Sequence, residues 1–405
     1  MRPDSDVLFV SLLVCLSQRI CKPIGSKENG ASPALLLIRH HLKIMSKLPI
    51  FLFVLVIGIL LLSVQISVFP QERIPWLSNI GAMEKRDSIT SIRSTANVTV
   101  SDGKEYLAES FYVDPQRSIF RIKYPDRTLT QGVEGKYFWS FDGKEEKEGT
   151  PQTETIVLGH QFHAQILFFD QIHRGSIVTE EQSPLSISVA DDRAAKWSMV
   201  HDSGVLRTMI IEIEGGPTVV NRFSDFRRID GVLLPHAISI DDGERTFTYK
   251  FTSIEFNKGS LGDYRAPEAV LTDEQKLLRY HRIVMDDHFF ENVDGMKSIN
   301  SDMIVVSRGE VSRMSEAESD AGFDRIVKGK DHYIYDDLIR PIVKISEDGT
   351  LGWVIVRVYA KGTYLDEEGE PTEPLEFTSA WIEMYEKIKG RWLMVGNVSN
   401  FVQDE

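Results

Sequence analysis

Three side chains that can donate or accept protons lie close together in the second half of the chain. Tyr280, His281 and His288 flank Leu277 and Val284, which recur at helical spacing. Because the apolar stripe of such a helix faces the interior, one of the polar groups could point into a pocket. An imidazole there could act as a general acid or base, since its pKa lies near neutrality. Alternatively, both histidines lie at the edges of the helix and are satisfied there.

Two adjacent carboxylates, Asp286 and Asp287, occupy the same predicted helix. Burial raises the pKa of a carboxylate, so one of them could serve as a base near neutral pH. Adjacent residues on a helix point in different directions. We therefore expect at least one of the two carboxylates to be solvated.

Charged side chains also occur on aromatic segments near the C-terminus that alternate like strands. With the two-residue period of a strand, Arg357 shares a face with Trp353 and Tyr359, and Glu383 lies between aromatic residues on another strand. Arg357 and Glu383 could line the mouth of a cavity, or they could form a cross-strand pair on a face turned towards a second subunit. We prefer the cross-strand pair.

Three histidines of the first half, His160, His163 and His173, raise the question of a metal site. The first two would share one helix face, as metal ligands often do. No carboxylate has a diagnostic spacing from them, and His173 lies beyond the expected end of the helix. We therefore interpret them as surface histidines and expect no metal site. The sequence also lacks a Gly-rich phosphate loop and a Gly-x-Ser-x-Gly elbow, so we expect no cofactor.

The elements that must position these residues fall into two groups. Between Ser88 and Asn257, short alternating segments are separated by turn residues, which predicts an antiparallel meander. Helical spacing interrupts this pattern from Thr153 to Asp170 and predicts one apolar helix. Such a helix needs a face to bury against, so we expect it to pack on the sheet.

The segment Phe223 to His236, followed by the strand from Thr246 to Asn257, resembles the closing strands of the outer-membrane lipoprotein-sorting fold. The resemblance covers residues 86–258. It implies a curved antiparallel half-barrel with a helical lid around an apolar cavity. It also implies ligand binding rather than catalysis.

A linker over residues 259–271 separates this domain from a second one over residues 272–403. Thr272 to Gln275 has the spacing of a capping box and opens a helix. The turn Asp348-Gly349-Thr350 before a long strand, and the closing segment Ala380 to Phe401, resemble the nuclear-transport-factor-2-like fold, closest to its SnoaL-like branch. This resemblance implies a cone in which helices close a curved antiparallel sheet around a pocket. The fold class is thus α+β, and we expect the two domains to fold independently.

The second resemblance also indicates where a ligand would bind. Some relatives are isomerases, dehydratases or hydrolases, many only bind ligands, and dimerisation through the sheet is common. Catalytic relatives often place a polar group on the last strand, where this chain has Asn397. The residues that we expect to bind a ligand in the C-terminal pocket are Tyr280, His281, Val284, His288, Arg357 and Asn397.

The N-terminal part of the chain predicts export or membrane anchoring. Leu48 to Gln71 has no charged side chain and is long enough to cross a bilayer. We interpret residues 45–71 as a signal peptide or membrane anchor starting at Met45, and residues 1–44 as a non-native or disordered extension. The basic flank predicts that the rest is exported to the periplasmic or extracellular face. If the signal is not cleaved, residues 48–69 would anchor the protein in the inner membrane.

The distribution of charge makes some classes of binding partner unfavourable. The net charge of −14 consists of +4 in residues 1–47 and −18 in the remainder, which makes nucleic acid a poor partner. We therefore expect an exported, non-catalytic protein that binds an apolar or amphipathic small molecule or lipid, with dimerisation through the C-terminal sheet. The alternatives are an isomerase- or hydrolase-type enzyme with its active site in the cone, or a tethered dimeric interaction protein. Convergent ionisable groups inside the cone would favour an enzyme.

Overall fold

The computed structural model describes residues 74, 76–173, 177–182, 185–190, 195–213 and 217–401. The expected extension over residues 1–44 and the expected signal or anchor over residues 45–71, with its possible span 48–69, lie outside the described residues. Within the described part, no helix is both long and apolar enough to cross a membrane.

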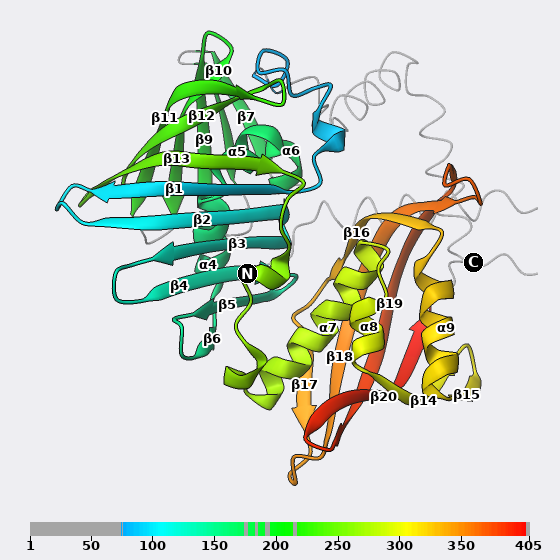
Figure 1. Cartoon of the computed structure of the whole chain (residues 1–405). Helices are drawn as coiled ribbons and strands as arrows, with labels where there is room; N and C mark the ends of the chain where they lie inside the picture. Colours follow the sequence, from blue (N-terminus) through cyan, green and yellow to red (C-terminus); the bar gives the residue numbers. More distant parts are fainter. Residues whose placement is uncertain are drawn as a thin grey trace, which may run out of the picture. The chain divides into compact units, whose positions relative to one another are not determined.

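The first domain is one open antiparallel sheet of thirteen strands that curves around short helices (Figure 1). The strands follow the order β6-β5-β4-β3-β2-β1-β13-β12-β11-β10-β9-β8-β7, so the pairing of β1 with β13 joins the two halves of the meander. Their bounds are β1 Ile92–Val100, β2 Glu105–Asp114, β3 Arg117–Lys123, β4 Thr128–Glu134, β5 Tyr137–Phe141, β6 Glu146–Glu148, β7 Ile177–Gln182, β8 Leu185–Ala190, β9 Ala195–Asp202, β10 Val205–Ile213, β11 Thr218–Ile229, β12 Val232–Asp241 and β13 Thr246–Phe256.

Three short helices, rather than the single helix expected over residues 153–170, interrupt the strands. The chain leaves the helical path after Gly159, where it passes close to the sheet: a Cβ at this position would lie 3.3 Å from Ile211 Cδ1. All three helices contribute to the apolar core of the domain, together with the segment that begins at Ile74. The bounds are α4 Pro151–Gly159, α5 Phe162–Leu167 and α6 Phe169–Ile172.

The second domain has an open sheet of seven strands in the order β15-β14-β20-β19-β18-β16, and β17 also pairs with β18. Its strands pair in antiparallel fashion except for β14 and β20, which run parallel. The bounds are β14 Asn300–Ser307, β15 Glu310–Met314, β16 Lys330–Asp337, β17 Ile342–Ile345, β18 Leu351–Leu365, β19 Pro371–Ile388 and β20 Arg391–Phe401.

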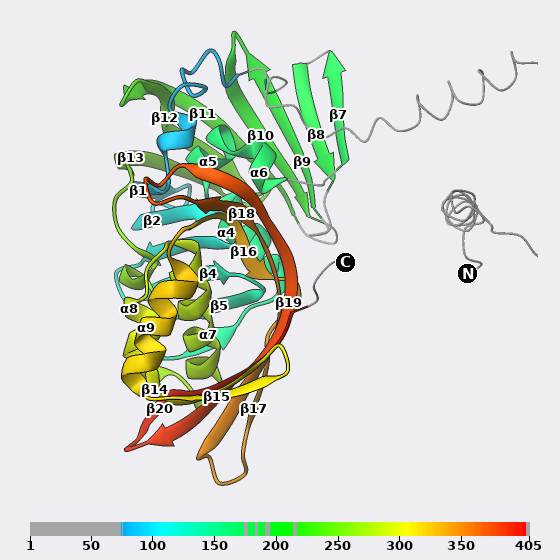
Figure 2. The same ribbon diagram turned by 90° about the vertical axis from the view of Figure 1, so that its right-hand side faces the viewer.

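Helices α7 (Asp273–Phe289), α8 (Asp294–Ser298) and α9 (Glu316–Val327) lie on the concave side of this sheet (Figure 2). The predicted capping box is confirmed, because Gln275 N donates to Thr272 Oγ1 and Thr272 N donates to Gln275 Oε1. The helices and the inner sheet face enclose a second apolar core, in which β18 contributes a row of small aliphatic side chains. With two open sheets and few helices the chain is mostly antiparallel β, so α+β describes it only approximately.

The segment between the two sheets is packed rather than extended. Two turns of 3-10 helix, Leu261–Asp263 and Glu268–Val270, shape it. Leu261 and Tyr264 join a third apolar cluster with Phe111 and Trp139 of the first sheet and with Leu278 of α7. Residues expected to form a linker therefore help to fix α7 against the first sheet.

Candidate functional site

Helix α7 contributes to the interiors of both domains. Leu277, Tyr280 and Val284 face the inner side of the second sheet, as their spacing predicts. Leu278, one position further along the helix than Leu277, belongs to the cluster formed with the first sheet. One helix thus positions side chains towards the cone interior and towards the domain junction.

Within the cone, the structure brings His281 between two carboxylates. Its Nδ1 lies 2.8 Å from Glu383 Oε1 and its Nε2 lies 3.0 Å from Asp337 Oδ1. All three side chains are at most 1% exposed. Burial alone would lower the pKa of His281, but the charges of Glu383 and Asp337 outweigh burial and raise this pKa to about 10. His281 is therefore an imidazolium at neutral pH that donates from both nitrogens, and it has no lone pair with which to act as a base.

The carboxylate of the buried Glu383 accepts hydrogen bonds from three side chains. Besides His281, it accepts hydrogen bonds from Trp381 Nε1 and from the Tyr385 hydroxyl, each at 2.8 Å. Asn397 lies directly opposite Glu383 on the neighbouring strand and is partly buried. Because the donors already serve Glu383, this part of the cone forms a structural core.

The other candidates on α7 are also engaged. The Tyr280 hydroxyl donates to Glu268 Oε1 at 2.7 Å, and Val284 packs in the apolar core. His288 stacks on Tyr335 with a centroid distance of 4.7 Å, and its Nδ1 donates to the Val284 carbonyl at 2.8 Å. Burial lowers the pKa of His288 to about 4, so its ring is neutral. The structure brings these α7 residues together, but each one contacts protein on its polar side.

The proposed pair of Arg357 and Glu383 is wrong. Arg357 lies opposite Ala380 and is exposed, whereas Glu383 lies opposite Val354 in the core. The two side chains therefore occupy opposite faces of the sheet. The sequence did not reveal the register between β18 and β19, and a shift of one residue moves a side chain to the other face.

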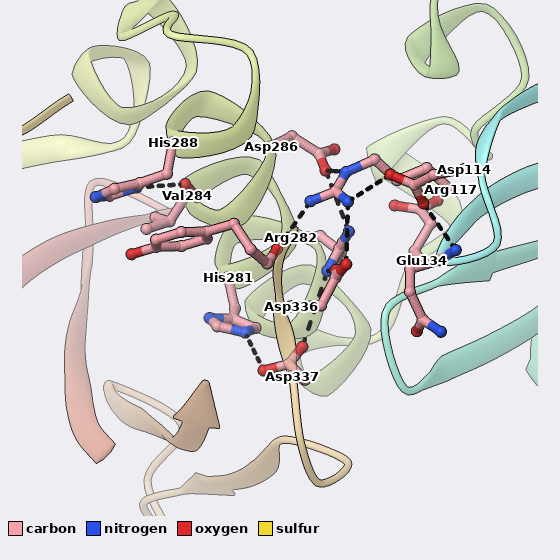
Figure 3. Close-up of polar contacts among 12 residues, drawn as sticks. Asp114, Arg117, Glu134, His281, Arg282, Val284, Asp286, His288, Asp336 and Asp337 are labelled. Atoms are coloured by element: carbon pink, nitrogen blue, oxygen red, sulfur yellow. Dashed lines mark hydrogen bonds and ion pairs between the residues drawn. The ribbon is translucent and has the colours of Figure 1, made fainter. Parts of the chain in front are cut away.

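A dense cluster of charges, not expected from the sequence, lies at the junction of α7 with the first sheet (Figure 3). The fully buried Arg117 donates from Nε to Asp286 Oδ1 at 2.9 Å and from NH1 to Asp114 at 3.0 Å and Asp336 at 3.2 Å. Arg282 donates to Asp336 Oδ1 at 3.1 Å and to Asp286 Oδ1 at 3.3 Å. Three guanidinium groups, including Arg265, lower the pKa of Asp286 against the effect of burial.

Arg265 and a fourth arginine, Arg279, extend the cluster towards carboxylates of the first sheet. Arg265 NH2 lies 2.6 Å from Glu134 Oε2 and 2.7 Å from Asp286 Oδ2. Arg279 NH2 lies 2.6 Å from Glu146 Oε2. The sequence signal for this cluster was the repeat of charges along α7 on the side away from its apolar stripe. Such a pattern ordinarily indicates a solvated face, and only the packed first sheet turns it into a buried one.

The expectation that one of Asp286 and Asp287 is solvated is also wrong, since both are less than a tenth exposed. Asp286 is covered by the arginine cluster, whereas Asp287 is covered by α8, because Met296 N donates to Asp287 Oδ2 at 2.6 Å. Burial raises the pKa of Asp287 to about 6. Two different neighbours therefore bury two carboxylates that point in different directions.

A pocket of about 420 Å³ opens beside these two carboxylates. Its polar wall includes Arg265, Asp286 and Asp287, and Asn257 and Asn292 lie at its rim. We call it the junction pocket. It shares none of the residues expected to bind a ligand inside the cone. Its apolar wall consists of Phe111, Val113, Leu261 and Phe290.

The interpretation of the first-half histidines as surface residues is wrong for two of the three. His163 hydrogen-bonds to Ser94 Oγ and to the Pro235 carbonyl, and His173 bonds to Gln165 Oε1, with both rings buried. His160 is partly exposed and stacks on a phenylalanine of the sheet. The helices insert into the curved sheet, so side chains expected at a surface become core. Among the described residues, no group of His, Cys, Asp and Glu could hold a metal ion.

Comparisons with known proteins found partial matches among solved structures. No family model and no curated protein matches the chain. A LolA superfamily protein from Nitrosomonas europaea is 14% identical, with a TM-score of 0.33, over 46% of this chain and 96% of that one. NTF2-like proteins from Rhodospirillum rubrum (14% identity, TM-score 0.26, 31% and 98% of the chains) and Cytophaga hutchinsonii (13%, 0.26, 33% and 100%) are also similar. The similar structures thus include both families that the sequence resembles.

Proposed function

We propose that the protein binds an apolar or amphipathic small molecule in the junction pocket and does not catalyse a reaction. The observation that carries this proposal is the composition of the pocket wall. Four of its fourteen lining residues are apolar, with Val113 and Phe290 more exposed than Phe111 and Leu261, and three are charged. Apolar side chains beside convergent polar and charged groups are a usual combination at small-molecule sites. An amphipathic molecule matches such a wall better than a wholly polar one.

An enzyme seated in the cone has less support. Convergent ionisable groups are present there, but His281, Asp337 and Glu383 are at most 1% exposed. A general acid or base must reach the proton that it transfers. His281 and Glu383 instead hydrogen-bond to one another and to neighbouring side chains.

Blocking the pocket chemically tests the proposal. In a full-length chain with Cys15 and Cys21 replaced by Ser, Ser91→Cys places a thiol on the pocket wall. Labelling it with a benzyl methanethiosulfonate should abolish the fluorescence of bound 1-N-phenylnaphthylamine, an apolar probe. Ser78→Cys, exposed and outside the pocket, is the matched control and should not change binding after labelling. Equal probe binding by both labelled variants would place the ligand elsewhere.

We also propose that two copies associate through the outer face of the second sheet. Side chains directly opposite one another form an apolar row across six strands on the face away from the helices. Its ends are well exposed, with Ile342 at 45% and Val311 at 69%. Contiguous exposed apolar surface of this kind usually marks an interaction site. The row consists of Ile342, Ile355, Ile382, Val398, Val306 and Val311.

Sedimentation equilibrium checks this association. Ile355→Asp would place a charge in the middle of the row and should shift the protein from dimer to monomer. Ile326→Asp, an exposed apolar position on α9, is the control and should leave the dimer intact. A monomeric parent protein would rule out the dimer.

The proposed location is outside the cytoplasm, on the periplasmic or extracellular face. It is supported by the uncharged run from Leu48 to Gln71 and its basic flank. Protease protection of the described domains in intact cells or spheroplasts distinguishes export from retention.

A further inference from the structure

Asp287 differs from Asp286, the other carboxylate on the wall of the junction pocket, in its lack of a basic partner. Within the described part of the chain, no Lys, Arg or His forms an ion pair with it, and its contacts are backbone N–H groups of α8. The adjacent Asp286 is paired with Arg117, Arg265 and Arg282. Asp287 is 6% exposed yet lies on the pocket wall. Its negative charge is therefore buried beside a cavity without a counter-charge.

The surrounding cluster has more carboxylates than cations, so it does not supply the missing charge. The cations are Arg117, Arg265, Arg279, Arg282 and His281. The carboxylates, besides Asp287, are Asp114, Glu134, Glu146, Asp286, Asp336, Asp337 and Glu383. A positive charge introduced by a ligand would relieve this excess, because opposite charges attract strongly where water is excluded.

We propose that the junction pocket selects cationic amphiphiles, that is, molecules with a primary ammonium group on an aromatic or aliphatic body. This inference rests on the proposed binding function and names the ligand class. The ammonium group would hydrogen-bond to Asp287, whose carboxylate can accept about four bonds and uses only part of that capacity on α8. The body would lie against Val113 and Phe290, the more exposed of the apolar lining residues.

An anionic ligand fits the pocket less well, although Arg265 is on its wall. Arg265 is 14% exposed and already donates to Glu134 and Asp286. An anion would have to displace one of these carboxylates, which would leave a buried charge without its partner.

The ionisation of Asp287 agrees with this selectivity. Burial raises its pKa to about 6, against the lowering effect of the α8 backbone and together with the negative charges of Asp286 and Asp294. At pH 7.5 the carboxylate is therefore still mostly ionised.

Calorimetric titration of the full chain with three molecules that share one body tests the inference. The probes are 4-phenylbutylamine, 4-phenylbutan-1-ol and 4-phenylbutanoate, which carry a positive, a neutral and a negative head at pH 7.5. The amine should bind roughly tenfold or more tighter than the alcohol, and the acid should bind most weakly. If the acid binds as tightly as the amine or tighter, the assigned ligand class is wrong, while the binding function stands. If none of the three binds, the proposed function itself fails.

Two variants locate the selectivity on Asp287. Asp287→Asn keeps an oxygen to accept from α8 and removes the charge, so the amine should lose its advantage over the alcohol while the alcohol binds as before. Asp294→Asn removes a nearby exposed charge that is not on the pocket wall and should keep the preference. An amine preference that survives in Asp287→Asn overturns the assignment. If Asp287→Asn does not fold, the order of the three probes on the parent chain still decides.

Discussion

At the scale of single residues, His281 acquires its charge from partners on two distant strands. Asp337 ends β16 and Glu383 lies within β19, and both reach the same imidazole from α7. The sequence allowed us to predict that His281 lies near the apolar stripe of α7. It gave no means to predict the two carboxylates, because their approach depends on the register and curvature of the sheet. A candidate base therefore proves to be a buried cation.

Removing this cation should be costly. In His281→Gln, Glu383 would be buried without a counter-charge and Asp337 would keep only Arg282, 3.9 Å away. We therefore expect the free energy of unfolding in urea to fall by about 3–5 kcal/mol. The double variant His281→Gln/Glu383→Gln should recover part of this loss. Arg357→Gln, on the exposed face, should cost less than about 0.5 kcal/mol. Equal effects of His281→Gln and Arg357→Gln would contradict the buried ion pairs.

The same ion pairs predict how stability changes with alkaline pH. The pKa of His281 is raised from 6.5 to about 10, so its contribution is complete below pH 6.5 and is lost as the pH rises towards 10. Within that window we expect stability to fall by up to about 1.4 kcal/mol per pH unit. His281→Gln should show a flatter profile over this range. A parent profile as flat as that of the variant would contradict the raised pKa.

Acid should weaken the protein for the opposite reason. Four buried or partly buried imidazoles have pKa values lowered to about 4, so the stability that they contribute is present above pH 6.5 and is lost as the pH falls to about 4. Urea unfolding measured between pH 7 and pH 4 should show this loss. The raised pKa of Asp287 opposes it, but only as a single group. Stability unchanged over this range would contradict the burial of these rings, which are His160, His163, His288 and His332.

At the scale of elements, α7 shows what a sequence pattern reveals and what it conceals. Its N-terminal capping box and its apolar stripe through Leu277, Tyr280 and Val284 were both predicted, since they follow from local geometry. The burial of its second face, which carries Leu278 and Arg279, was not predicted, because a helix face with charged residues is ordinarily solvated. Contacts with the first sheet bury this face, and no local sequence pattern indicates those contacts.

Truncating that second face should destabilise the chain. Leu278 is 3% exposed and packs with the first sheet, so Leu278→Ala should lower the free energy of unfolding by about 2–5 kcal/mol. Ile326→Ala, at an exposed position on α9, should cost less than about 1 kcal/mol. Thermal unfolding by circular dichroism is sufficient to compare them. Similar midpoints would show that the packing on this face contributes little.

At the scale of the whole molecule, we could predict two sheets separated by a short connecting segment. The prediction rested on alternation, turn residues and the motifs that carry the family resemblances. The packing of residues 259–271 could not be predicted, because Leu261 and Tyr264 gain their partners from the first sheet. The junction pocket escaped prediction for the same reason, since its walls come from segments far apart in sequence. Independent folding of the two domains, expected from the linker, stays a prediction.

The contacts nevertheless lead to a definite expectation for fragments. Residues 268–405 alone would expose Leu278, and they would leave Arg279 without Glu146 and Asp286 without Arg117. We therefore expect this fragment to unfold at a lower temperature than the intact chain, which should show one cooperative transition by scanning calorimetry. Two separate transitions in the intact chain, one matching the fragment, would show that the junction does not couple the domains.

The most direct test of the central claim is photoaffinity mapping of where an amphipathic ligand binds. A diazirine derivative of 4-phenylbutylamine would be irradiated with the full chain, and the modified peptides identified by mass spectrometry. Binding in the junction pocket predicts modification of residues 260–262 and 290–292, and protection by an excess of unmodified amine. Protectable modification concentrated around Tyr280 and His288 in the cone, or on the helices inside the first sheet, would contradict it.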